Sequence, residues 1–337
     1  MFSGTVASVA PTAESVTLRE HYSLVELPDR NFQPRYDDPR AGYGGLSFVD
    51  YSVPIGEPMI QRWLHRHRLE KKDPNAAISE PVKPIEYWVD SGAPEDVKKA
   101  LIEGASWWNQ AFEAAGFRNA FKVAVLQETA DPMDIRYNMI NWVHRSTRGW
   151  SMGGTVADPR TGEIIKATVT LGSLRDRQDY LIFEGLLSPY TTGDEKPDIL
   201  YQTALARIRQ LAAHEVGHTL GLGHNYYDST AGWISVMDYP HPQEKLRAAA
   251  TGNGIIDLTE AYPAHIGEWD KVAINYGYRP LPHGDESAAL TKILDDAWAK
   301  DLRYMSNQDT GIHPRVDQWS NGVNQADELN RIMKVRR

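Results

Sequence analysis

The 337-residue chain contains no cysteine. This absence excludes disulfide bonds, thiolate metal ligands and a catalytic thiol, so any metal site would have to use nitrogen and oxygen donors. The net charge is −9 and no basic cluster stands out, so we expect no nucleic-acid partner. No apolar run approaches the roughly 20 residues that cross a bilayer, which excludes a transmembrane helix. The N-terminus lacks the basic start and long apolar block of a signal peptide.

The first 80 residues differ in composition from the rest. They contain strand candidates at His21–Leu27 and Gln61–Leu69, separated by a loop rich in proline, glycine and aspartate. This region cannot bury much apolar surface alone, so we interpret residues 1–80 as an N-terminal extension or the remnant of a preceding domain. Residues 81–337 are expected to form the main domain.

Strand and helix patterns alternate in the main domain. Strands are predicted at 85–90, 121–126 and 135–145, a hairpin at 149–172, and helices at 94–115, 175–187, 198–220 and 285–301. The strand–helix–strand order at the start implies a parallel pair of strands. One arm of the hairpin should run antiparallel to the other strands, at an edge of the sheet.

The stretch AHEVGHTLGLGHN at 213–225 holds three of the 11 histidines. His214 and His218 are four residues apart on the predicted helix, so their rings stack one turn apart, away from its apolar spine. Gly221 and Gly223 can adopt positive φ, which would end the helix and return His224 as a third ligand. Three nitrogen ligands leave a fourth position open, as in catalytic zinc sites, so we predict one Zn²⁺ per chain.

Glu215 is the candidate catalytic residue. It is turned by about 100° from the first histidine of the helix, which places its carboxylate near the metal and not on it. That position suits a base that acts on zinc-bound water. His144, His65 and His67 raise the question of a second metal, but scattered or alternating histidines are more often ordinary surface or core residues.

HEVGHTLGLGH resembles the zinc signature of the metzincin clan of metallopeptidases, H-E-x-x-H-x-x-G-x-x-H, at every fixed position. SVMDYP at 235–240 resembles the methionine-containing turn of that clan. The resemblance implies that Met237 lies beneath the zinc and that Tyr239 reaches the zinc or the oxyanion of the reaction. It also implies a zinc-dependent endopeptidase that acts on protein or peptide substrates.

The chain is most similar to a bacterial family of extracellular or periplasmic metzincins. The similarity covers most of residues 17–280 and includes HYSLVELPD, RHRLEKKDP, EGASWWNQAFEAAGF, WVHRSTRGWSMG, DPRTGEIIKATVTLGSLR and SVMDYPHP. It implies a secreted or periplasmic location. Ala167-Thr168 stands where we expect Gly-His in this family, a departure that lies outside the zinc motif.

The same resemblance implies an α+β, metzincin-like zincin fold. A twisted, mostly parallel five-stranded sheet would form an upper subdomain (81–221) with a backing helix and the active-site helix. A smaller lower subdomain (222–337) would hold the methionine turn and a C-terminal helix. Substrate would lie extended along the hairpin arm at Trp150–Ala157, with Gly153, Gly154 and Thr155 as backbone partners and Pro240 in a pocket wall.

Two alternatives remain open on sequence alone. The same chemistry would serve a zinc hydrolase of non-peptide amides or esters, although an open edge strand favours a peptidase. The chain could also be an inactive binding module with a metzincin fold. The presence of Glu215 and of all three histidines speaks against that second alternative. The oligomeric state stays unknown.

Overall fold

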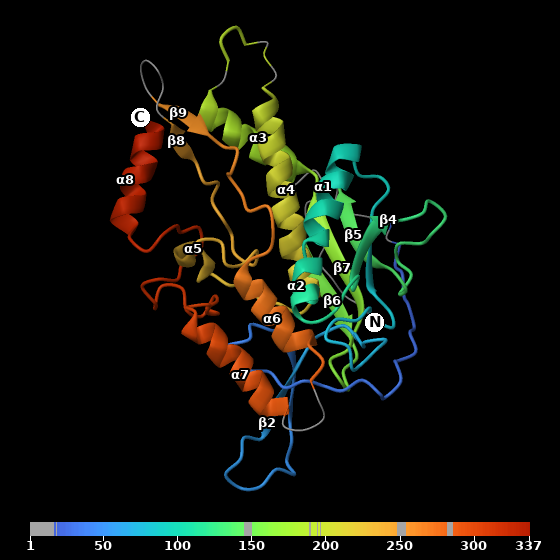
Figure 1. The fold of residues 1–337 in the computed structure, drawn as a ribbon. Coiled ribbons are helices and arrows are strands. Elements are labelled where there is room, and N and C mark those ends of the chain that lie inside the picture. Colours follow the sequence, from blue (N-terminus) through green and yellow to red (C-terminus); the bar gives the residue numbers. More distant parts are fainter. Residues whose placement is uncertain are drawn as a thin grey trace.

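The computed structural model describes residues 17, 19–144, 150–188, 190–193, 195, 197–247, 254–281 and 286–337, without the side chains of residues 229 and 230. At its centre is a five-stranded sheet (Figure 1). Its strands are β3 (Ile85–Val89), β4 (Phe121–Val125), β5 (Asn138–Val143), β6 (Met152–Ala157) and β7 (Ile164–Gly172). Their order is β4-β3-β5-β7-β6, and only the β6–β7 pair is antiparallel. The predicted parallel pair, hairpin and edge strand are confirmed.

The helix that carries the histidine motif is α4 (Asp198–Thr219). It packs along α1 (Glu95–Ser106) and also contacts β6 and β7 (Figure 1). Its predicted apolar spine is buried, at Leu205, Ile208, Ala212, Val216 and Leu220. The last two turns are buried on nearly every side, including the motif's polar residues. The prediction of a helix over 198–220 is confirmed.

The helix predicted over 94–115 is interrupted. It consists of α1 and a separate α2 (Asn109–Ala114), joined by a tight turn at Trp107 and Trp108. The indole of Trp108 lies in the core, where its N–H donates to the carbonyl of Ala213 on α4 at 2.9 Å. The predicted stop at Gly116 is confirmed, since this residue has φ +91°.

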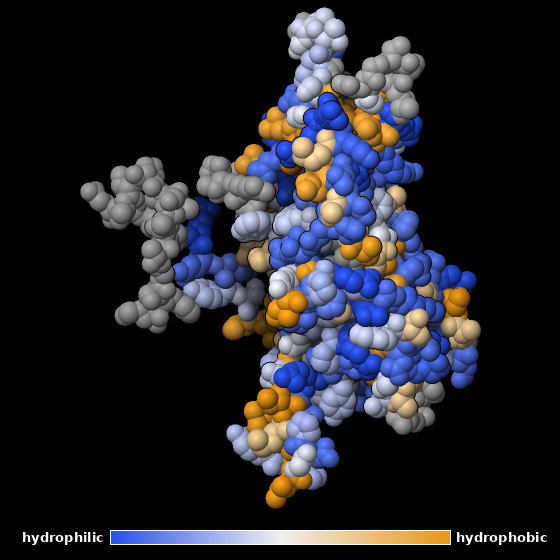
Figure 2. All heavy atoms as spheres, turned by 90° about the vertical axis from the view of Figure 1, so that its left-hand side faces the viewer, coloured by the Kyte–Doolittle hydropathy of each residue, from blue (hydrophilic) through white to orange (hydrophobic). Residues whose placement is uncertain are grey.

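The N-terminal region contains a two-stranded antiparallel hairpin of β1 (Gly45–Val49) and β2 (Ile60–Leu64). The prediction for Gln61–Leu69 therefore holds only in its first half. The strand predicted at His21–Leu27 is wrong: these residues are exposed and form no strand, and no strand that the structure describes pairs with them. The tip of the hairpin projects at the bottom of Figure 2, with apolar side chains such as Ile55 at its surface.

After α4 the chain consists of helices and two short strands joined by long loops. Its elements are α5 (Asp228–Ala231), β8 (Lys245–Arg247), β9 (Ile255–Asp257), α6 (Glu268–Tyr278), α7 (Glu286–Ala299) and α8 (Gln325–Arg336). The predicted helix at 285–301 corresponds to α7, which ends two residues earlier than predicted, before Asp301 with its φ of +60°. Asp285 lies outside the described residues. Trp298 was predicted on its buried side but is 48% exposed, with the guanidinium of Arg303 4.3 Å from its ring centre.

The helix predicted over 175–187 is α3 (Leu174–Leu187), which packs on α4. Helix α6 was not predicted, although it contributes Trp269, Ala273, Ile274 and Tyr278 to the main core. Among the helices that the structure describes, none combines the length and apolar character that crossing a membrane would require.

Candidate metal centre and active-site cleft

Three histidines meet where α4 ends. His214 and His218 lie on the helix, and His224 follows after a turn that begins at Gly221, where φ is +104°. Any larger residue at 221 would also collide with the carbonyl of His65, since a Cβ would lie 2.1 Å from that oxygen. Gly223 was expected to adopt positive φ as well, and it does not. Its small size is needed because a Cβ would lie 2.7 Å from the hydroxyl of Tyr304.

The N-terminal region supports this turn from below. Gly223 donates its N–H to the carbonyl of Gly42 at 2.7 Å, and Gly44 donates to the carbonyl of Gly221 at 2.8 Å. The ring of His67 hydrogen-bonds the carbonyl of Thr219 at 3.1 Å. The buried His67 is thus engaged in holding the end of α4.

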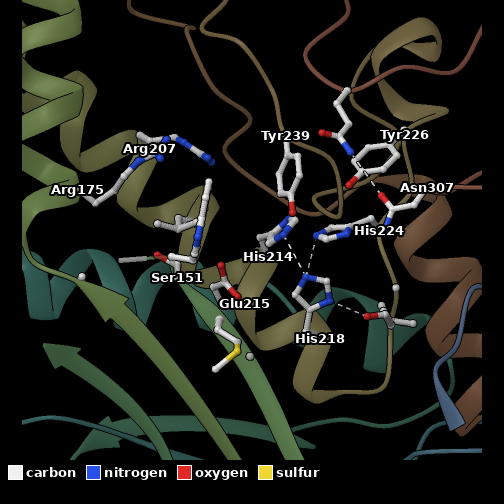
Figure 3. A pocket seen from close by; sticks show the side chains of 18 of the residues that line it. Ser151, Arg175, Arg207, His214, Glu215, His218, His224, Tyr226, Tyr239 and Asn307 are labelled. Carbon is white, nitrogen blue, oxygen red and sulfur yellow. Dashed lines mark hydrogen bonds between the residues drawn. The ribbon is translucent and has the colours of Figure 1, made fainter. Parts of the chain in front are cut away.

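The ring nitrogens of the three histidines converge on one point (Figure 3). The Nε2 atom of His218 lies 3.2 Å from Nε2 of His214 and 3.2 Å from Nε2 of His224. Nδ1 of His214 faces the carbonyl of Val236 at 2.8 Å, and Nδ1 of His218 faces the carbonyl of Leu222 at 2.8 Å. Because a carbonyl can only accept, each Nδ1 carries the hydrogen and each opposing Nε2 presents a lone pair.

This donor set fits a zinc ion. Burial lowers the pKa of all three rings, that of His224 to about 4, so the imidazoles are neutral at pH 7. Tetrahedral zinc with bonds of about 2.0–2.1 Å places its ligands roughly 3.3 Å apart, close to the separations between these nitrogens. Neutral lone pairs at such short range need a cation between them. In the part of the chain that the structure describes, no other group of three such residues could hold a metal.

The methionine turn lies beneath the histidines. Met237 is fully buried, and a Cβ on Gly217 of α4 would lie 2.3 Å from its sulfur, so glycine at 217 makes room for this methionine. Asp270, at the start of α6, accepts hydrogen bonds from the hydroxyl of Ser235 at 2.7 Å and the N–H of Val236 at 2.9 Å. It thereby fixes Val236, the residue whose carbonyl orients the first histidine.

Sequence reasoning missed this carboxylate. Asp270 is the N3 residue of α6, and it accepts the N–H of Gly267 at the helix start. Gly-Glu-Trp-Asp at 267–270 is a helix-start signal that would have revealed both α6 and its buried acid.

Glu215 lies at the base of the cleft and is 4% exposed. Its carboxylate accepts a hydrogen bond from the backbone N–H of Gly153, and burial raises its pKa to about 7 against the opposing effect of nearby Arg207. Gly153 lies so close to α4 that a Cβ would be 2.3 Å from the carbonyl of Glu215. Gly153 and Thr155 line the cleft, whereas Gly154 points to open space, as alternation along a strand requires.

Tyr239 follows the methionine turn and lies over the histidines. Its ring centre is 4.6 Å from that of His224 and 5.5 Å from that of His214, and its hydroxyl hydrogen-bonds that of Tyr226. On its other face it stacks on Trp319 at 5.0 Å. The packing of Trp319 was not foreseeable from local sequence, since 80 residues separate the two rings.

Pro240 does not line this cleft, contrary to the prediction that it forms a pocket wall. It lies in a neighbouring groove with His241 and Pro242, between α3 and α8. Trp319 borders both spaces, so the C-terminal segment supplies the wall that was assigned to Pro240.

The cleft has a volume of about 790 Å³. One side is formed by the N-terminal end of β6 with Trp150 and Ser151, and another by the C-terminal segment with Asn307 and Trp319. Arg175 and Arg207 line it beyond Glu215, on the side away from the histidines (Figure 3). Neither arginine was singled out from the sequence, although Arg207 precedes His214 by seven residues and therefore shares its helix face.

Comparison with known families gives two matches. A family model described as Met-zincin matches residues 196–337, a range that contains the three histidines, Glu215 and Met237. A second model, described as Domain of unknown function (DUF5117), matches residues 1–72. No curated protein matches the chain.

Proposed function

Given that a Met-zincin family model matches residues 196–337, we propose that this chain is a zinc-dependent endopeptidase. One observation carries the proposal. Two imidazoles with hydrogen on Nδ1 point their Nε2 atoms at one another across 3.2 Å, and a buried carboxylate, Glu215, is the next residue after the first of them. A site for one divalent cation with a carboxylate beside it is the arrangement that metal-assisted hydrolysis requires.

The proposed chemistry divides between the metal and the protein. A zinc ion held by His214, His218 and His224 would supply a Lewis acid that polarises the scissile carbonyl and lowers the pKa of water. Glu215 takes the proton of the attacking water and passes it to the leaving amine. Its pKa of about 7 suits both steps, since the group can gain and lose a proton near neutral pH.

Two further groups would assist Glu215. The N–H of Gly153 holds the carboxylate in one orientation, which keeps the base aimed at the metal centre. The hydroxyl of Tyr239 points toward the histidines in Figure 3 and would donate a hydrogen bond to the oxyanion that forms on the substrate.

The edge strand supports a peptide as substrate. β6 pairs with β7 on one side, and its residues Gly153 and Thr155 line the cleft. An extended peptide can add to such an edge through main-chain hydrogen bonds, which recognise any sequence in the same way. Non-peptide amides and esters lack this repeating backbone.

Metal analysis combined with a digest tests the proposal. The purified chain should contain one zinc per molecule and cleave an unfolded protein, with cleavage abolished by a chelator and restored by zinc. The variant Glu215→Gln should keep its zinc and lose cleavage. Zinc binding without any hydrolysis would indicate a binding module, and hydrolysis of small esters alone would indicate the other class of hydrolase.

The proposed site of action is the periplasm or the exterior of a bacterial cell. It is supported by the resemblance to extracellular and periplasmic metzincins. Fractionation of the source cells, followed by detection of the protein in each fraction, would test this part of the proposal.

A further inference from the structure

The side chain of Arg207 is buried in the wall of the active-site cleft without a full set of hydrogen-bond partners. The residue is 3% exposed and lines the cleft. Among the residues that the structure describes, none accepts a hydrogen bond from its Nη1. The ring of Tyr262 lies 5.6 Å from the guanidinium carbon and covers one face of it. A buried guanidinium nitrogen without an acceptor is unfavourable, so its retention beside a cleft points to an acceptor that comes from outside.

The charged groups around Arg207 are engaged elsewhere. Arg175, on α3, lines the same cleft and contacts Asp179 at 3.2 Å. Asp179 is 2% exposed and is the carboxylate of this cluster, so its single negative charge faces two guanidinium groups. Glu215 is the other acid that influences Arg207, and its carboxylate is engaged by Gly153 in the catalytic position. Neither carboxylate accepts a hydrogen bond from Nη1 of Arg207, so this nitrogen is left for a ligand.

We propose that Arg207, with Arg175 beside it, forms a subsite that binds a carboxylate of the substrate. The enzyme then prefers peptides that carry aspartate or glutamate, or their own C-terminal carboxylate, near the scissile bond. This inference rests on the proposed peptidase function. Arginine suits the role because its planar fork binds a carboxylate through two parallel hydrogen bonds.

The helix geometry places this subsite along the bound peptide. Arg207 precedes His214 by seven residues, which corresponds to about 10 Å along the axis of α4. An extended peptide advances about 3.3 Å per residue. The carboxylate should therefore belong to a residue within three positions of the bond that is cleaved.

Paired fluorogenic peptides test the subsite. Each pair differs only in aspartate against asparagine, scanned over three positions on either side of the cleaved bond, with the C-terminus amidated. A second set has a free C-terminus at the same positions, which separates a side-chain carboxylate from a terminal one. We expect a kcat/KM about ten- to hundredfold higher for the carboxylate at one position, the range for a hydrogen bond to a charged group.

Three variants link the preference to the arginine. Arg207→Met should reduce the ratio of the paired rates to near one and keep the zinc content. Loss of its charge near Glu215 should change the rates for both peptides of a pair by the same factor, so the ratio isolates the subsite. Arg207→Lys keeps the charge and should keep part of the preference. Arg209→Met is the matched control, because Arg209 lies two residues along the same helix and pairs with Glu103 at the surface. It should keep the wild-type ratio. If Arg207→Met does not fold, the subsite is tested by the ratio of the paired rates in the wild-type enzyme and by the partial loss of that ratio in Arg207→Lys.

The outcomes separate this subsite from the proposed function. Cleavage without any preference for a carboxylate would overturn the subsite and leave the peptidase standing. If no peptide is cleaved, the proposed function fails, and binding of the same pairs to the zinc-loaded chain by fluorescence anisotropy then decides the subsite. The subsite is supported if the wild-type chain binds the carboxylate peptide more tightly than its asparagine partner and Arg207→Met abolishes that difference. Equal binding of the two peptides by the wild-type chain would overturn the subsite.

Discussion

Replacing Gly153 by alanine should push the edge strand away from the active-site helix. The new Cβ would lie 2.3 Å from the carbonyl oxygen of Glu215 and 2.9 Å from Cβ of His218. Ordinary contact begins at 3.4 Å, so the two backbones must separate by about 1 Å. Overpacking of this kind costs about 1–3 kcal/mol of folding stability. A displacement of about 1 Å near the catalytic carboxylate should also lower kcat/KM roughly 10²-fold.

The adjacent residue provides the control. A Cβ on Gly154 would meet nothing within 4 Å, although it lies in the same strand. Gly154→Ala should therefore leave activity unchanged and raise stability by up to about 0.5 kcal/mol, because alanine loses less backbone entropy on folding than glycine. Urea unfolding of the zinc-loaded proteins and kcat/KM on one peptide check both. If the two variants behaved alike in both assays, β6 would not rest on α4 as described.

Three other substitutions have clear expected outcomes. Glu215→Gln should keep zinc and lower kcat about 10²- to 10⁴-fold. In the unmodified enzyme, activity should fall as the pH drops below an apparent pKa no higher than about 7. Burial raises the pKa of Glu215 to that value, and a bound cation lowers it. If Glu215→Gln shows the same loss of activity at low pH, the titrating group is not Glu215. Tyr239→Phe should lower kcat roughly 10- to 100-fold at constant zinc content, and an unchanged rate would remove it from the mechanism. Asp270→Asn loses one acceptor for the methionine turn, so unfolding should become easier by about 1–3 kcal/mol and zinc affinity weaker by about 10- to 100-fold in chelator competition. Normal affinity in that variant would show that the turn is held in another way.

The elements that sequence predicted correctly are those in which local pattern and tertiary packing agree. β3 alternates between buried and half-buried residues, and α4 carries an uninterrupted spine, so period and burial coincide. The histidine spacing could be converted to geometry because two of the three lie on one regular helix. The position of the third histidine, His224, follows from the turn at Gly221, whose positive φ depends on the glycine itself and could be predicted from the sequence.

The failures arise where distant contacts decide the outcome. His21–Leu27 has the composition of a strand, yet none of the described strands pairs with it. At the turn formed by Trp107 and Trp108, the indole N–H of Trp108 donates to a carbonyl on α4, about 100 residues further along the chain. Pro240 was placed in the cleft by its nearness to Tyr239 in sequence, but Trp319 occupies that side. Packing across such separations leaves no periodic signal.

Gly153 illustrates a more subtle gap. Sequence reasoning placed it on the substrate strand for its backbone, whereas the structure also requires its lack of a side chain. The distance from an edge strand to a helix is set by the whole sheet. A single glycine in a strand pattern indicates close approach of another backbone without indicating which one.

The support that Gly42 and Gly44 give to the loop before His224 bears on how such proteins are divided for laboratory work. The two family matches cover residues 1–72 and 196–337 separately. Yet the backbone of that first segment hydrogen-bonds to the loop that positions His224. Removal of residues 1–72 would delete Gly42 and Gly44 and with them both of these hydrogen bonds. The unit to express and crystallise should therefore include both matched segments.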